Sequence, residues 1–172
     1  MRKLLTVAAV LAMLALPALA QDAPKAELFG GYQYTRINPG SGIPGQNLNG
    51  WNAALTGNLG QTLGITADIS GAYKTVAGIS NHDHFFLFGP TLASHSNESF
   101  TPFAHALFGV AHASGGGFSD NAFAMALGGG IDVKVADHVA VRVGQFDYLM
   151  TRFGSATQSN FRYSAGIVFR FE

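Results

Sequence analysis

The 172-residue sequence contains no cysteine and few charged side chains. The absence of cysteine excludes disulfide bridges and thiolate metal sites. Asp, Glu, Lys and Arg make up 12% of the chain, whereas about a quarter of the residues of a soluble domain are charged. Twenty-two glycines and a 12% aromatic content accompany this low charge. The composition indicates a protein whose outer surface does not face water.

The first twenty residues have the pattern of a secretory signal peptide. Basic residues at positions 2 and 3 precede an apolar run at 4–16, and Pro17 and an Ala-Leu-Ala sequence follow. The run is shorter than the ~20 apolar residues of a membrane-spanning helix, and the three-part pattern is that of a cleaved leader. We predict cleavage after Ala20 and a single domain at 21–172, because no linker-like stretch interrupts that region.

The net charge of the mature chain argues against a nucleic-acid partner. Removal of Arg2 and Lys3 with the leader leaves eight basic and ten acidic residues, a net charge of −2, whereas nucleic-acid-binding domains carry a basic patch. Glycine clusters at 115–117 and 128–130 lack the Lys-Ser/Thr and the βαβ context of a phosphate-binding loop. We therefore expect no nucleic acid and no nucleotide cofactor.

From residue 25 onward, apolar side chains alternate with small or polar ones in segments of about ten residues, the pattern of half-buried strands. In the seventh segment the alternation of apolar and polar residues becomes irregular after Gly144, which predicts a β-bulge. The fourth segment is nearly all apolar, so its facing is ambiguous, and its Pro90 must lie where no ladder hydrogen bond is required. The eight segments are 26–36, 50–59, 63–73, 84–93, 101–112, 123–133, 139–148 and 161–171.

The connections between these segments are predicted to alternate in length. Short connections are expected at 60–62, 94–100 and 135–138. Alternating long loops and short turns are typical of outer-membrane barrels. The long connections are expected at 37–48, 74–82, 113–121 and 151–160.

Each segment has an apolar face and a second face that carries the small or polar side chains. The second face distinguishes a membrane barrel from a soluble sandwich or lipocalin-like barrel. It carries Gly, Ala, Ser, Thr and Asn with isolated charges, and it lacks the Lys and Glu of a soluble surface. In hydrocarbon a sheet satisfies every backbone group only by closing on itself. The sequence thus predicts an all-β fold, an eight-stranded antiparallel up-and-down transmembrane β-barrel. Aromatic girdles are expected from Tyr32, Tyr34, Trp51, Tyr73, Tyr148, Phe161, Tyr163 and Phe171.

Several charged residues fall on the small-residue face, where they would be buried in the lumen and need partners. We favour a plug of paired charges, because a ring that selects ions needs a barrel wider than eight strands. Glu27 and His105 share this face. The expected lumen charge network consists of Asp68, Asp132, Arg142, Arg162 and Arg170.

Two groups of residues suggest chemistry, and for both we prefer a non-chemical interpretation. The stretch 94–98 has Ser, His, Asn and Glu and resembles the motif of the lipid A deacylase barrels, but adjacent Ser and His side chains point opposite ways on an extended chain. His82 and His84 share a face, with His112 a possible neighbour, yet a metal site needs a further ligand. We expect solvated rim histidines and no catalytic, cofactor or metal site.

Several stretches together resemble the porin-family or OmpA-like outer-membrane β-barrel domain and cover nearly all of the mature chain. They are NGWNAALTGNLGQTLGITADISGAY, HFFLFGP, TPFAHALFGVAHA, AFAMALGGGIDVKV, DYLMTRFG and FRYSAGIVFRF. The resemblance implies both termini in the periplasm, four loops outside, outer-membrane lipid around the barrel and the barrel-assembly machinery as a partner during biogenesis. It implies no catalytic residues. OmpA itself continues into a peptidoglycan-binding domain, and anchoring of the cell wall is not expected here.

These observations lead us to expect a protein of the bacterial outer membrane that is not an enzyme. A structural or surface-interaction barrel is the first hypothesis, with recognition through extracellular loops for which the sequence specifies no ligand. A small pore for solutes or ions is the second, and a lipid A-modifying enzyme the third.

Overall fold

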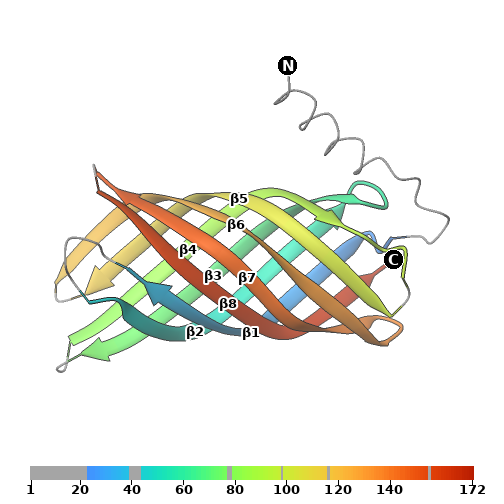
Figure 1. Cartoon of the computed structure of the whole chain (residues 1–172), viewed down its shortest axis with the longest axis horizontal. Helices are drawn as coiled ribbons and strands as arrows, with labels where there is room; N and C mark the ends of the chain where they lie inside the picture. The colour runs from blue at the N-terminus through green and yellow to red at the C-terminus, as the bar shows by residue number, and fades with distance from the viewer. Residues whose placement is uncertain (1–22, 39–43, 77–78, 98, 116, 155) are drawn as a thin grey trace, which may run out of the picture.

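The computed structural model describes residues 23–38, 44–76, 79–97, 99–115, 117–154 and 156–172. Within these ranges eight antiparallel strands follow one another around a closed barrel, and β1 pairs with β8 (Figure 1). The expected eight-stranded up-and-down barrel is confirmed. No helix in these ranges has the length and apolar composition needed to cross a membrane. The strands are β1 Ala26–Ile37, β2 Gln46–Asn58, β3 Leu63–Val76, β4 Ile79–Ala93, β5 Phe100–Gly115, β6 Phe118–Ala136, β7 Val139–Phe153 and β8 Ala156–Phe171.

The barrel has two different ends. The turn end carries the β2–β3, β4–β5 and β6–β7 connections, with the start of β1 and the end of β8. The hairpin end carries the β1–β2, β3–β4, β5–β6 and β7–β8 connections. Figure 1 shows the strands tilted against the long axis, with these two ends at opposite sides of the picture.

The alternation of side chains places large apolar residues on the outside and small or polar ones in the lumen. On β3, for example, Ile69 is 43% exposed, whereas Asp68 is 2% and Ser70 0% exposed. On β8 the outward apolar positions run from Phe161 to Phe171, the length at which a tilted strand crosses hydrocarbon, about 9–11 residues. The outward apolar side chains include Leu28, Tyr32, Trp51, Leu55, Phe86, Phe88, Phe108, Phe123, Leu127, Ile131, Tyr148 and Phe169. This outer surface is the apolar band.

The facing of β4, which the sequence left ambiguous, follows the same rule. Phe85 and Leu87 are buried in the lumen, whereas Phe86 and Phe88 are exposed on the outside. Pro90 is exposed, and the β4–β5 register contains no pair at its position. Pro90, which has no N–H, therefore lies at a gap in the β4–β5 ladder. It still pairs with Ile65 in the β3–β4 ladder, and β4 continues to Ala93.

The β-bulge expected in β7 is present. Arg142 pairs with Gly166 of β8, and the next pair joins Gln145 to Ser164, so β7 contains one extra residue there. The β6–β7 ladder shifts register at the same place. As a result Arg142 and Gln145 both face the lumen although three positions separate them, and Asp147 also turns inward.

Three of the four predicted long connections are wrong. β3 extends to Val76 and β4 starts at Ile79; the β5–β6 ladder reaches the pair Gly115–Phe118, and the β7–β8 ladder reaches Phe153–Ala156. The polar residues of 74–82, 113–121 and 151–160 continue the antiparallel ladders beyond the apolar band. Their polarity reflects contact with water at the hairpin end, not a loss of strand structure.

The predicted connection at 37–48 is shorter than expected, because β1 ends at Ile37 and β2 begins at Gln46. Gly117 and Gly154 have φ values of 85° and 57°, the left-handed conformation that glycine accepts without steric cost. Both glycines lie beside the tips of hairpins. The hairpin end is thus built mainly from paired strands.

Candidate functional site

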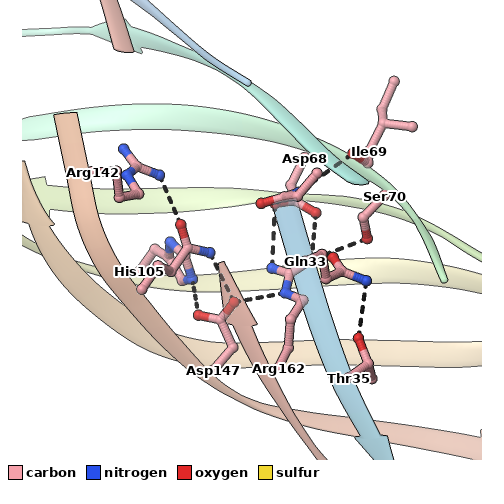
Figure 2. A network of polar contacts seen from close by, with 11 residues as sticks. Gln33, Thr35, Asp68, Ile69, Ser70, His105, Arg142, Asp147 and Arg162 are labelled. Carbon is pink, nitrogen blue, oxygen red and sulfur yellow. Dashed lines mark hydrogen bonds and ion pairs between the residues drawn. The ribbon is translucent and has the colours of Figure 1, made fainter. Parts of the chain in front are cut away.

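Arg162 is the centre of the polar lumen. This residue of β8 is 1% exposed, and its guanidinium donates to Asp68 of β3, with Nη1–Oδ1 at 2.8 Å and Nη2–Oδ2 at 3.2 Å. Its Nε donates to Asp147 Oδ2 of β7 at 2.7 Å, and Nη1 also reaches Ser70 Oγ at 3.2 Å. Because β1 and β2 lie between β8 and β3 in the wall, the Arg162–Asp68 pair spans the lumen (Figure 2).

Asp147 joins this pair to a second group of side chains. Its Oδ1 lies 2.8 Å from His105 Nε2, and its Oδ2 accepts a hydrogen bond from Gln145 Nε2 at 2.8 Å. Gln145 Oε1 in turn accepts from Arg142 Nη1 at 2.7 Å. Gly128 makes room for the aspartate, since a Cβ there would collide with the Asp147 carboxylate and the Phe146 carbonyl. Figure 2 shows His105 and Arg162 both joined to Asp147 by dashed lines.

Arg142 forms an ion pair with a carboxylate and also stacks on two aromatic rings. Its Nε and Nη2 donate to the two oxygens of Asp132 at 2.8 and 3.0 Å. Its guanidinium carbon lies 4.3 Å from the centre of the Phe29 ring and 4.1 Å from that of Phe103. A planar guanidinium suits both contacts, because it binds a carboxylate through two parallel hydrogen bonds and stacks on aromatic faces.

A third ion pair lies near the turn end. Arg170 Nε donates to Glu27 Oε1 at 3.0 Å, and its Nη2 donates to Thr101 Oγ1 at 3.0 Å. His95, from the β4–β5 connection, places its Nε2 4.0 Å from the same Glu27 oxygen and its Nδ1 2.9 Å from the Gln61 carbonyl. Residues of two turn-end connections, Gln61 and His95, thus come together near Glu27.

The central contacts form one continuous lumen network, running Asp68, Arg162, Asp147, Gln145, Arg142, Asp132. Three carboxylates face two guanidiniums in it, and His105 adds a positive charge when it is protonated. The cavity beside the network is about 20 Å³, roughly the space of one water molecule. This arrangement fills the lumen at the level of the network and links strands that are not neighbours in the wall.

The five predicted lumen residues all face inward. Asp68 and Arg162 pair with each other, as do Asp132 and Arg142, whereas Arg170 pairs separately with Glu27. Glu27 and His105, expected on the same face, are also inward.

Asp147 and Gln145, which connect the two halves of the lumen network, were not among the residues predicted from the sequence. Both follow the bulge of β7, where simple alternation no longer predicts which side chains face inward. The signal was present, because restarting the alternation after Gly144 places both residues on the lumen face. Asn52 is also buried, and its Nδ2 donates to Asp68 Oδ2 at 2.8 Å.

The stretch that resembles a hydrolase motif does not assemble a nucleophile with a base. Ser94 and Ser96 hydroxyls bond to each other at 2.9 Å, and the His95 ring is directed to Gln61 and Glu27. Position 98 lies outside the described residues. A serine nucleophile requires a base within hydrogen-bond reach of its hydroxyl, and the described geometry provides no such contact here.

The three histidines at 82, 84 and 112 lie on the outer rim of the barrel. His84 and His112 are directly opposite across β4 and β5. His84 Nε2 lies 3.2 Å from the hydroxyl of Tyr73, to which Trp51 Nε1 also donates at 3.0 Å. In the part of the chain that the structure describes, no three His, Cys, Asp or Glu side chains are placed to hold a metal ion.

Similarity to known proteins is found among solved structures. No protein-family model matches the sequence, and no curated protein matches it. The structure of Ail, the attachment invasion locus protein of Yersinia pestis, is similar with a TM-score of 0.57 and 16% identity over 86% of this chain and 99% of that one.

Two further solved structures are similar over comparable lengths. Neisserial surface protein A gives a TM-score of 0.66 at 12% identity, covering 88% of this chain and 100% of that one. OprG of Pseudomonas aeruginosa gives 0.55 at 11% identity, covering 89% and 98%. The resemblance to this group is confirmed for the fold, and the chain therefore has the architecture of the eight-stranded outer-membrane β-barrels.

Proposed function

We propose that this protein is a non-catalytic, integral β-barrel of the bacterial outer membrane whose lumen is closed and whose hairpin end serves a structural or surface-interaction role. The single observation that carries the proposal is the Arg162–Asp68 pair across a lumen with about 20 Å³ of free space at that level. A wall braced in this way leaves little aqueous path for solutes.

The outer surface supports the membrane location. The apolar band would be costly in water, and its width matches hydrocarbon. Outer-membrane lipid is therefore the proposed surrounding, and the barrel-assembly machinery the proposed partner during insertion. The hairpin end is proposed to face the outside, and the turn end, with Glu172, the periplasm.

The similar structures favour a surface role over transport. Ail is described as an attachment invasion locus protein, and one of its structures contains a heparin analogue, sucrose octasulfate. Neisserial surface protein A is described as a surface protein. In this chain the outward side chains of the hairpin end offer a polar surface that includes Arg36, Asn47, His112, Asn121 and Arg152.

Single-channel recording tests the proposal against the pore hypothesis. Purified protein reconstituted in a planar bilayer should conduct weakly or not at all, because the lumen network occupies the path. Large and stable conductance would show a water-filled pore and replace this proposal. Unchanged lipid A mass spectra after expression of the protein are expected, and a change would favour an enzyme instead.

A further inference from the structure

The hairpin half of the lumen differs in character from the charged half. Buried polar side chains such as Thr151 and Asn160 lie in this half. Strands β4 to β7 add buried apolar side chains, several of them alanines, which leave space that larger residues would fill. They are Phe85, Leu87, Leu107, Ala111, Ala122, Ala124, Ala126 and Leu149. A cavity of about 240 Å³ lies at this level, lined by Ile37, Asp83, Phe85, Ala111, Ala113, Thr151 and Gln158. It is about twelve times the free volume beside the lumen network.

Of the described residues that line this cavity, Asp83 is the one with an ionisable side chain. It pairs in register with Ala72 on one side and Ala113 on the other, neither of which has a polar side chain. Among the described residues, none forms a hydrogen bond or ion pair with its carboxylate. The residue lies on the hairpin side of Phe86, beyond the apolar band, and burial raises its pKa to about 6, with His82 acting in the opposite direction.

Among the described residues, no ion pair joins Asp83 to the other charged groups near it. Lys74 on β3 lies further toward the hairpin end, opposite Asn81. Asp120 on β6 accepts a hydrogen bond from the backbone of Asn121 and is exposed. Neither residue lines the cavity. Asp83 therefore presents an unpaired acidic group to an otherwise apolar and weakly polar chamber.

We propose that this cavity binds a small organic ammonium ion with an apolar body. The ammonium group would pair with the Asp83 carboxylate, which otherwise bears the cost of partial burial without a partner. The apolar body would lie against Phe85, Ala111 and Ala113, in the way that small-molecule sites combine apolar walls with a few polar groups. An apolar cavity of about 150 Å³ holds benzene, so about 240 Å³ suits a phenylalkylamine.

Thr151 and Gln158 allow one further polar group on the ligand. The Thr151 hydroxyl donates to Gln158 Oε1 at 3.4 Å and accepts from Asn160 Nδ2 at 3.2 Å. The 3.4 Å contact is long for a hydroxyl donor, so a ligand can replace it at small cost. An anionic ligand of the same size is excluded, because its charge would oppose that of Asp83. The site is independent of whether the hairpin end also binds a larger partner.

The test is an NMR titration of ¹⁵N-labelled full-length mature protein in dodecylphosphocholine micelles at pH 7.5 with 2-phenylethylammonium. We expect saturable shifts of the Ala111 and Ala113 amides, weaker binding of 2-phenylethanol, and no saturable binding of 3-phenylpropionate. Asp83→Asn should weaken ammonium binding about tenfold or more, a change of about 1.4 kcal/mol, and leave 2-phenylethanol unchanged. Lowering the pH to 5 should weaken ammonium binding to the wild type, because Asp83 then becomes protonated.

Two further variants keep the test decisive. Asp120→Asn, at the same end but outside the cavity lining, should bind the ammonium ion as the wild type does. Ala113→Leu should abolish binding of both 2-phenylethylammonium and 2-phenylethanol by filling the cavity, and the dispersion of each spectrum reports folding. The proposal is overturned by equal affinity of wild type and Asp83→Asn, by binding of 3-phenylpropionate, or by shifts confined to outward-facing residues.

Discussion

Arg162 on β8 and Asp68 on β3 form a doubly hydrogen-bonded ion pair between side chains that are 0% and 2% exposed. The two strands are not neighbours in the wall, so the pair connects opposite parts of the barrel. A chain of hydrogen bonds continues from it through Asp147 and Gln145 to Arg142. The charged lumen is thus one connected network.

Replacement of one partner of the central pair should destabilise the barrel strongly. Arg162→Ala or Asp68→Ala leaves a buried charge with incomplete compensation, which costs about 3–5 kcal/mol. Urea unfolding in detergent, followed by heat-modifiable gel migration, measures this loss. Lys134→Ala is the matched control, because its pair with Asp137 is exposed and exposed pairs contribute ~0–1 kcal/mol. Equal stability of the two kinds of variant would contradict the network.

Lys74 would be a poor control for this comparison, although it falls in a stretch that the sequence predicts to be a loop. Lys74 lies in β3, paired with Asn81, and not in a loop. Its substitution would change a strand position that faces the interior of the hairpin end. Lys134 is also a strand residue, paired with Ala140 of β7, but its side chain is 37% exposed and its partner Asp137 is 89% exposed.

Arg142→Lys should also lower stability although it retains the positive charge. Lysine cannot form both hydrogen bonds to Asp132 together with the bond to Gln145 in the same geometry, and it lacks the planar surface that lies between Phe29 and Phe103. We expect a loss of about 1–3 kcal/mol for these charge-assisted contacts. The same urea assay measures it, and wild-type stability of this variant would show that charge alone matters.

Deletion of Val143 should leave the fold intact. With one bulge residue removed, Arg142, Gly144 and Gln145 become consecutive and match both neighbouring ladders, so the inward side chains keep their faces. Deletion of Phe146, a regular position, should instead shift Asp147 out of the lumen and prevent folding. The folded fraction on unheated gels compares the two deletions. If the two deletions prevented folding to the same extent, this register would be contradicted.

Cysteine labelling should establish which end faces outward. The wild-type chain has no cysteine, so introduced residues react without background. Asp120→Cys at the hairpin end should react with a membrane-impermeant maleimide in whole cells, and Asp137→Cys at the turn end should react only after lysis. The reverse pattern would invert the proposed orientation.

Cleavage of the leader should give a mature protein that begins at Gln21. The pattern before this residue is that of a signal peptide, and residues 1–22 lie outside those described by the structure. Intact mass of protein extracted from the membrane measures the new N-terminus. A mass that includes residues 1–20 would disprove the prediction.

The alternation of side chains was sufficient to predict the architecture and the direction of most side chains. Residues such as Ile69, Asp68 and Arg162 lie on regular strands, where a period of two determines their faces directly. Their assignment requires only that one face be apolar. The number of alternating segments then determined the number of strands, because a membrane sheet must close on itself.

The tertiary structure decided the features that depend on register and on contacts between distant strands. Which arginine pairs with which aspartate depends on the positions of strands across the lumen, and Asp147 enters the network only because one extra residue in β7 changes the phase. The hairpins are long because polar residues remain hydrogen-bonded to a neighbouring strand when they leave the membrane, and local polarity does not reveal that pairing. The cavity at Asp83 likewise arises where side chains from five strands leave space between them, a volume that no single segment of the sequence encodes.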